Sequence, residues 1–132
     1  MPKAIRIHQQ GGPEVMQWED VQLGNPGPGE ARVLHKACGL NFLDVYQRTG
    51  LYKLPLPSGM GNEGAGVVEA VGTGVTHVKA GDRVAYAGGP VGAYCEARNL
   101  PGLTGAKTFS RAHAIGSPGQ WPHCCRRGTR QC

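Results

Sequence analysis

Glycine recurs so densely between Ser58 and Val84 that this glycine-rich stretch limits what the chain can fold into. Glycines at positions 59, 61, 64 and 66 suit sharp turns and close backbone approach rather than a regular helix. Valines at positions 67, 68 and 71 then favour a short buried strand, which ends at the turn Gly72-Thr73-Gly74. The stretch therefore predicts a β-hairpin whose second strand covers residues 83–86.

Three of these glycines, Gly59-x-Gly61-x-x-Gly64, have the spacing of a dinucleotide-binding fingerprint, but their context differs from it. A working fingerprint lies between a buried strand and a helix N-terminus, so that backbone N–H groups face the pyrophosphate. Here Pro55-Leu56-Pro57 precedes the glycines and β-branched valines follow them, which disfavours both the strand and the helix. We interpret the glycines as the lead-in to the hairpin and not as a phosphate-binding loop.

Strand patterns dominate the first hundred residues. Residues 3–8 alternate apolar and polar side chains, and we expect Ile5 and Ile7 to point inward. Further strands are expected over residues 15–23 and 31–37, separated by a loop rich in glycine and proline. The fold is therefore expected to be mainly β rather than an alternation of strands and helices.

One short helix is expected, from Asn41 to Gly50. The Asn41 side chain can cap free backbone N–H groups, Asp44 complements the helix dipole, and Gly50 is a natural stop. The spacings of three and four residues place four side chains on one face of this helix. These are Phe42, Val45, Tyr46 and Thr49.

The pattern changes after Pro101. Residues 102–132 show neither strand alternation nor a helical stripe, so we expect an irregular, dispensable tail that comes from a frameshift or alternative splicing. The net charge of +5 comes from this tail, because the preceding residues hold as many acidic as basic groups. RNA binding through the tail is a remote alternative, since only Trp121 could stack on bases there. The histidines and cysteines of the tail have no recognised metal-binding spacing. They are His113, His123, Cys124, Cys125 and Cys132.

Targeting signals are not evident in the sequence. The first residues do not resemble a secretion signal, and no run approaches the roughly 18 apolar residues that span a bilayer. The five cysteines imply no disulfide framework, and reduced cysteines suit a cytoplasmic protein with no membrane attachment. We expect Cys38 to be a small buried hydrophobic residue.

Two groups of motifs resemble a known family. The stretch Gly61-Asn62-Glu63-x-x-Gly66, followed by Gly72 and Val75, resembles the signature of the zinc alcohol dehydrogenases, in the medium-chain dehydrogenase/reductase superfamily, with Asn62 in place of the usual histidine. Together with Gly39-Leu40-Asn41-Phe42-Leu43-Asp44-Val45-Tyr46 and Arg48-Thr49-Gly50-Leu51-Tyr52, it looks similar to the zinc-free quinone oxidoreductases, the zeta-crystallin-like branch. The resemblance runs from Met1 to about Pro101 and implies a GroES-like partial barrel, the substrate-side domain of such enzymes.

The resemblance also implies that catalytic zinc is missing. Asn41 and Asn62 occupy the positions of a cysteine and a histidine ligand, and Leu43 lies at or close to the proton-relay position. Asparagine amides are poor zinc ligands, so no metal site is expected. Hydride transfer then needs an acceptor that is already electrophilic, such as a quinone or an activated enone.

By the same resemblance, the nicotinamide of NADPH lies beside the start of the helix. Asn41 could orient a carboxamide or the acceptor carbonyl, and the tyrosines could donate hydrogen bonds or pack against rings. From the residues alone, Asn41 as a helix cap and the tyrosines as amphipathic residues at the border of the core remain alternatives. The expected cofactor-binding residues are Asn41, Phe42, Leu43, Asp44, Val45, Tyr46 and Tyr52, of which Asn41 and Tyr52 are the catalytic candidates.

The sequence therefore predicts two regions, a GroES-like, alcohol-dehydrogenase-type domain over residues 1–101 and a tail outside the family over residues 102–132. The family's nucleotide-binding domain is expected to be absent, so that the isolated chain is an inactive part of an NADPH-dependent quinone oxidoreductase. The alternatives are a non-catalytic interaction module and an inert truncated product. Homo-oligomers are left open for full-length family members.

Overall fold

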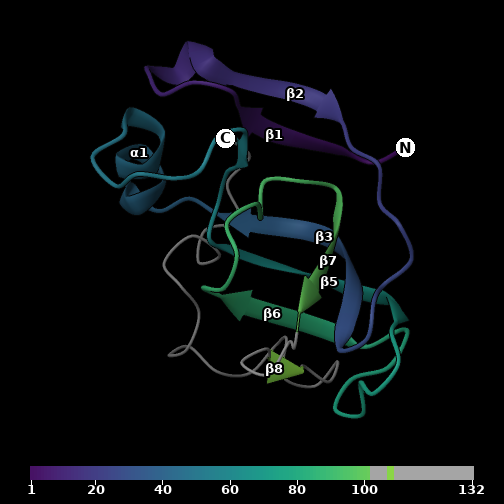
Figure 1. Ribbon diagram of the computed structural model, residues 1–132. Coiled ribbons are helices and arrows are strands. Elements are labelled where there is room, and N and C mark those ends of the chain that lie inside the picture. Colours follow the sequence, from purple (N-terminus) through teal and green to yellow (C-terminus); the bar gives the residue numbers. More distant parts are fainter. Residues whose placement is uncertain (102–106, 109–132) are drawn as a thin grey trace.

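Two antiparallel sheets and one α-helix make up the fold, which is given by a computed structural model that describes residues 1–101 and 107–108 (Figure 1). The three-stranded sheet has the order β2-β1-β4 and the five-stranded sheet the order β7-β3-β5-β6-β8. The first sheet contains β1 (Lys3–Ile7), β2 (Met16–Asp20) and β4 (Ser58–Gly59). The second contains β3 (Glu30–Gly39), β5 (Glu63–Val71), β6 (Arg83–Ala87), β7 (Ala97–Pro101) and β8 (Lys107–Thr108). The predicted mainly β fold with one short helix is confirmed.

Strand β7 was not predicted from the sequence. Its two buried residues, Ala97 and Leu100, are separated by the polar pair Arg98-Asn99, so the segment lacks the alternation of a half-buried strand. It also ends at Pro101, which cannot donate a backbone hydrogen bond. Because β7 pairs only with β3 at the border of its sheet, the proline is tolerated there.

The glycine-rich stretch leads into strand β5 and not into a helix, as predicted. Strand β5 pairs with β6 through Glu63 to Val67, which forms the expected hairpin. Gly61, just before β5, has a φ of +91°. A Cβ there would also lie 2.4 Å from the ring of Tyr94, so only glycine allows this close contact.

Two clusters of buried apolar side chains stabilise the sheets. The larger one fills the five-stranded sheet with valines from three strands, and Leu100 completes it from β7. The smaller one joins Ile7 of β1, Val15 and Met60. Val15 belongs to a short 3-10 helix, η1 (Pro13–Val15), between β1 and β2.

The two sheets are joined by the segment that precedes β7. Ala4 forms an isolated bridge with Cys95, the N–H of Ile5 donates to the carbonyl of Tyr94 at 2.8 Å, and the N–H of Glu96 donates to the carbonyl of Lys3 at 2.8 Å. These contacts fix Tyr94 relative to β1. They make residues 94–96 a connection between the sheets rather than a free loop.

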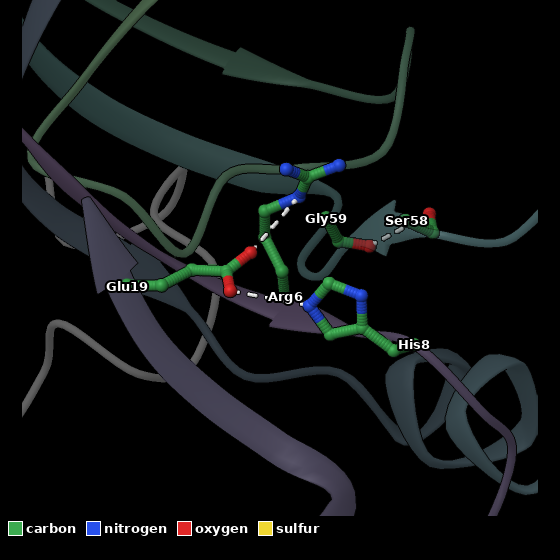
Figure 2. Close-up of polar contacts among 5 residues, drawn as sticks. All are labelled: Arg6, His8, Glu19, Ser58 and Gly59. Atoms are coloured by element: carbon green, nitrogen blue, oxygen red, sulfur yellow. Dashed lines mark hydrogen bonds and ion pairs between the residues drawn. The ribbon is translucent and has the colours of Figure 1, made fainter. Parts of the chain in front are cut away.

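Ion pairs on the outer side of the three-stranded sheet add a surface contact between β1 and β2. Figure 2 shows the Glu19 carboxylate between Arg6 and His8. The Arg6 Nε lies 3.4 Å from Glu19 Oε1, and the His8 Nε2 lies 3.1 Å from Glu19 Oε2. Because all three side chains are partly exposed, this cross-strand contact contributes at most about 1 kcal/mol.

The helix α1 (Phe42–Thr49) lies to one side of the sheets (Figure 1) and has the predicted limits. It begins after Asn41, whose backbone N–H donates to the Asp44 carboxylate at 2.9 Å, and it ends at Gly50. No helix among residues 1–101 and 107–108 has the length and apolar character needed to cross a membrane. The predictions for the tail concern residues outside the described part, except that Lys107–Thr108 pair with β6.

Candidate functional site

The candidate site is the outward face of α1, which is apolar although it faces away from the core. Phe42 is 72% exposed, and Leu43 and Val45 are exposed beside it. The predicted shared face of Phe42, Val45, Tyr46 and Thr49 thus exists, and it points away from the core. An exposed apolar patch of this kind usually marks a place where a ligand or another protein surface packs.

Aromatic rings extend this face beyond the end of the helix. The rings of Phe42 and Tyr46 meet edge to face at 5.3 Å, and those of Tyr46 and Tyr52 meet edge to face at 5.6 Å. The N–H of Tyr52 donates to the carbonyl of Tyr46 at 3.1 Å, which ties the loop after α1 to the helix. Tyr52 is 53% exposed, so its ring is accessible. We call the three residues Phe42, Tyr46 and Tyr52 the aromatic wall.

The underside of α1 is polar, and its buried residues are Asp44, Gln47 and Arg48. Asp44 Oδ1 accepts a hydrogen bond from Asn62 Nδ2 at 2.5 Å, and the same Nδ2 donates to Gln47 Oε1 at 2.9 Å. Arg48 Nη1 donates to the carbonyl of Gly11 at 2.7 Å. A soluble helix usually buries its apolar face, so α1 is inverted with respect to that rule.

Asn62, at the start of β5, has its amide turned toward the underside of α1. Its Nδ2 is already shared between two oxygen acceptors, Asp44 and Gln47. An amide nitrogen carries no lone pair that binds a metal well, so this arrangement suits hydrogen bonding rather than zinc coordination. Within the described part of the chain, no group of three or more His, Cys, Asp or Glu residues could hold a metal ion.

The predicted site residues therefore separate into two layers. Phe42, Leu43, Val45, Tyr46 and Tyr52 are brought together on the outward side. Asn41 lies half-buried at the helix start, between the layers. Asp44 faces the interior and is only 4% exposed, so its carboxylate is beneath the aromatic wall and not on it.

Tyr94 and Gln47 belong to the site but were not singled out from the sequence. The Tyr94 hydroxyl donates to Asp44 Oδ2 at 2.6 Å. Tyr94 follows the glycine-rich segment 88–92, where no periodic pattern indicates burial. The only signal for Gln47 was its spacing of three residues from Asp44, which places both on one side of a helix.

A second polar cluster joins β3, β6 and the segment before β7. His35 Nδ1 lies 2.9 Å from the carbonyl of Cys95, and His35 Nε2 lies 2.9 Å from the Tyr86 hydroxyl. Burial lowers the pKa of His35, raises the pKa of Tyr86 to about 12 and raises the pKa of Cys95 to about 11. All three groups are therefore neutral near pH 7 and their hydrogen bonds are structural.

Cys38 is exposed, so the expectation that it is buried is wrong. The buried residues of β3, Ala31 and Val33, lie in its first half, and Cys38 lies beyond them near the end of the strand.

Comparison with known proteins places the fold in a family. Residues 27–128 match the alcohol dehydrogenase GroES-like domain. The chain is 60% identical to the quinone oxidoreductase of Pseudomonas aeruginosa over 97 aligned residues. The aligned region covers 73% of this chain and 30% of that relative. The chain thus spans about a third of the length of the curated relatives it matches.

Solved structures give the same result. A quinone oxidoreductase of Pseudomonas syringae superposes with a TM-score of 0.80 and 51% identity, over 85% of this chain and 34% of that one. The Escherichia coli quinone oxidoreductase, solved as a complex with NADPH, superposes with a TM-score of 0.79 and 46% identity, over 83% of this chain and 34% of that one. The chain therefore belongs to the alcohol dehydrogenase GroES-like domain family, within the quinone oxidoreductase branch of the medium-chain dehydrogenase/reductase superfamily.

Proposed function

We propose that this chain forms the substrate-side part of an NADPH-dependent quinone oxidoreductase, which reduces quinones or activated enones by hydride transfer. The observation that carries the proposal is the aromatic wall, a row of rings on and just after a helix that turns its apolar side outward. Flat rings bind well against the faces and edges of other aromatic rings. Both a quinone and a nicotinamide are flat rings of suitable size.

The described residues fit the ring end of a nicotinamide cofactor better than its phosphates. Free N–H groups at a helix N-terminus are a common phosphate-binding site. At the start of α1 the Asp44 carboxylate already accepts the N–H of Asn41, and its negative charge repels a second anion. Most of the phosphate contacts are therefore proposed to come from the nucleotide-binding part of a longer reductase polypeptide.

When bound, NADPH would supply the hydride that an electrophilic acceptor takes up, and a proton from solvent would complete the reduction. The Tyr46 ring packs against one of the flat rings and limits its tilt. The Tyr52 hydroxyl donates a hydrogen bond to a quinone oxygen, where negative charge develops as hydride arrives. Asn41 orients a carboxamide or the acceptor carbonyl from the helix start.

The 132 residues alone are proposed to give negligible turnover. Orientation of two reactants contributes roughly 7 to 11 kcal/mol in well-aligned reactions, and that contribution needs a firmly held cofactor. With ring contacts only, NADPH binds too weakly to supply it. The test compares the 132-residue chain with a fusion of Met1–Pro101 to the nucleotide domain of a family member, both assayed with NADPH and duroquinone.

We expect activity from the fusion and only background from the chain alone. In the fusion, Tyr52→Ala and Asn41→Ala should each lower kcat/KM about tenfold, the loss that follows from about 1.4 kcal/mol of transition-state contact. Trp18→Ala, which removes an exposed ring of β2, serves as the control and should change nothing. An inactive fusion contradicts the assignment to the quinone oxidoreductases. Strong turnover by the isolated chain contradicts the division of cofactor contacts between two domains. If the chain and the fusion both fold but neither is active, a non-catalytic interaction module is favoured.

A further inference from the structure

The inverted helix raises the question of what holds α1 in place. Its inward side carries Asp44, Gln47 and Arg48 instead of apolar residues. Apolar packing tolerates small rotations, whereas hydrogen bonds weaken steeply with distance and angle. The orientation of α1 therefore depends on a few directional polar contacts.

These contacts converge on the Asp44 carboxylate. Oδ2 accepts hydrogen bonds from the Asn41 N–H at 2.9 Å and from the Tyr94 hydroxyl at 2.6 Å, and Oδ1 accepts one from Asn62. The three donors come from the helix start, the start of β5 and the segment before β7. A buried carboxylate must be satisfied in this way, because an unpaired one costs several kcal/mol.

Tyr94 is the donor most firmly attached to the rest of the fold. Its ring packs against Gly61, its backbone N–H donates to the carbonyl of Met60 at 2.8 Å, and its carbonyl accepts from Ile5 at 2.8 Å. Burial and the Asp44 carboxylate raise the pKa of Tyr94, so its hydroxyl keeps its proton and stays a donor. Tyr94 thus connects β1 and the segment between β4 and β5 to the underside of α1.

The aromatic wall moves with the helix. Tyr46 lies within α1, and Tyr52 is tied to it by a backbone hydrogen bond and by ring contact. We infer that Tyr94 is a positioning residue, which acts through Asp44 to set the tilt of α1 and thereby the places of the Tyr46 and Tyr52 rings. This inference rests on the proposed function, in which those rings hold the quinone and the nicotinamide.

The test uses the 132-residue chain with ¹³C-labelled tyrosine. The variant Tyr94→Phe keeps the ring that packs on Gly61 and removes only the hydroxyl. At a temperature well below unfolding, we expect the ring resonances of Tyr46 and Tyr52 to shift. The dissociation constant for duroquinone, measured by NMR titration, should rise about tenfold, in line with the loss of one hydrogen bond to a charged group.

The matched control is Tyr86→Phe, which removes another half-buried tyrosine hydroxyl, the one bound to His35 and not to α1. It should lower the unfolding temperature while leaving the Tyr46 and Tyr52 resonances and duroquinone binding unchanged. A purely structural Tyr94 would behave like this control. The inference is overturned if Tyr94→Phe leaves both readouts unchanged.

A double-mutant cycle with Asp44→Asn tests whether Tyr94 acts through Asp44. If it does, the double variant should bind duroquinone no more weakly than the worse single variant. Additive losses of affinity would show that Tyr94 acts independently of Asp44. If Tyr94→Phe does not fold, Asp44→Asn is compared with Tyr86→Phe by the same two readouts. If the unaltered chain binds no duroquinone but its ring resonances shift in Tyr94→Phe, the proposed function fails and the positioning of the rings stands.

Discussion

The Nε2 of His35 lies 2.9 Å from the hydroxyl of Tyr86, and the other ring nitrogen of His35 faces the carbonyl of Cys95 at the same distance. Because a carbonyl oxygen only accepts, we assign the proton to Nδ1, which leaves Nε2 as the acceptor for the Tyr86 hydroxyl. The neutral imidazole is thus satisfied on both sides. Protonation would place a donor against this hydroxyl in a half-buried site.

The first prediction is a loss of stability in mild acid. Burial lowers the pKa of His35 below the ordinary 6.5, so the unfolded chain binds more protons than the folded one below that pH. The contribution of His35 to the free energy of unfolding should therefore be complete above about pH 7 and fall as the pH drops below 6.5. Thermal unfolding between pH 5 and 8 measures this. His35→Gln should flatten the profile, whereas the exposed His77→Gln should not; an unchanged profile in His35→Gln would contradict the assignment.

The second prediction concerns the alkaline side and Cys95. Burial raises the pKa of its thiol from 9.0 to about 11, so the folded chain holds this proton longer than the unfolded one. The contribution to stability is complete below pH 9 and is lost as the pH rises toward 11. Iodoacetamide at pH 8.5 should accordingly modify the exposed Cys38 faster than Cys95, as peptide mass spectrometry would show. Equal rates for both thiols in the folded chain would refute the prediction.

The third prediction is that no stoichiometric zinc binds at the positions of Asn41 and Asn62. The Asn62 amide donates to Asp44 and Gln47, and the poor affinity of amides for zinc leaves Glu63 as a lone strong ligand. Elemental analysis of the purified chain measures the zinc content. One zinc per chain that disappears in Asn62→Ala or Glu63→Ala would contradict the prediction, whereas zinc that persists in both variants lies elsewhere.

The fourth prediction is that a chain ending at Pro101 keeps its fold. The buried apolar residues identified in the described part all lie between Ala4 and Leu100. Only two residues of β8 pair with β6. We expect limited proteolysis of the full chain to leave a core ending near Pro101, with an unfolding temperature within about 5 °C of the original, a change of about 1 kcal/mol. Loss of cooperative unfolding in the shortened chain would contradict the predicted domain boundary.

Local chemistry made the helix predictable, and long-range contacts made its orientation unpredictable. Asn41, Asp44 and Gly50 are cap and stop signals that act within a few residues, and α1 has the limits they indicate. The inward side of α1 is hydrogen-bonded to Tyr94 and Asn62, which lie outside the helix in the sequence and show no periodic pattern. Spacing identifies the residues that share a face but gives no information about which face is buried.

The strands show the same division. The strands β1 and β3 were predicted because apolar and polar side chains alternate along their sequence. The glycines around Gly61 were interpreted as a lead-in to a strand because the residues on either side disfavour a helix. Strand β7 was not predicted because its extended structure depends on pairing with β3 and not on its own composition. The site was predicted as one set of residues from a family resemblance, whereas its division into an outward aromatic layer and a buried polar layer required the structure.

The outward face of α1 takes no part in either core, and under the proposed function this separates the fold of the domain from the choice of its ligand. Replacing Leu43 or Val45 changes the shape and polarity offered to a flat ring while the valine cluster and the Asp44 contacts remain as they are. Under the proposed function, new acceptors can therefore be selected by changing a few side chains that lie outside both cores. In that case this helix is a surface on which substrate range can diverge while the scaffold stays the same.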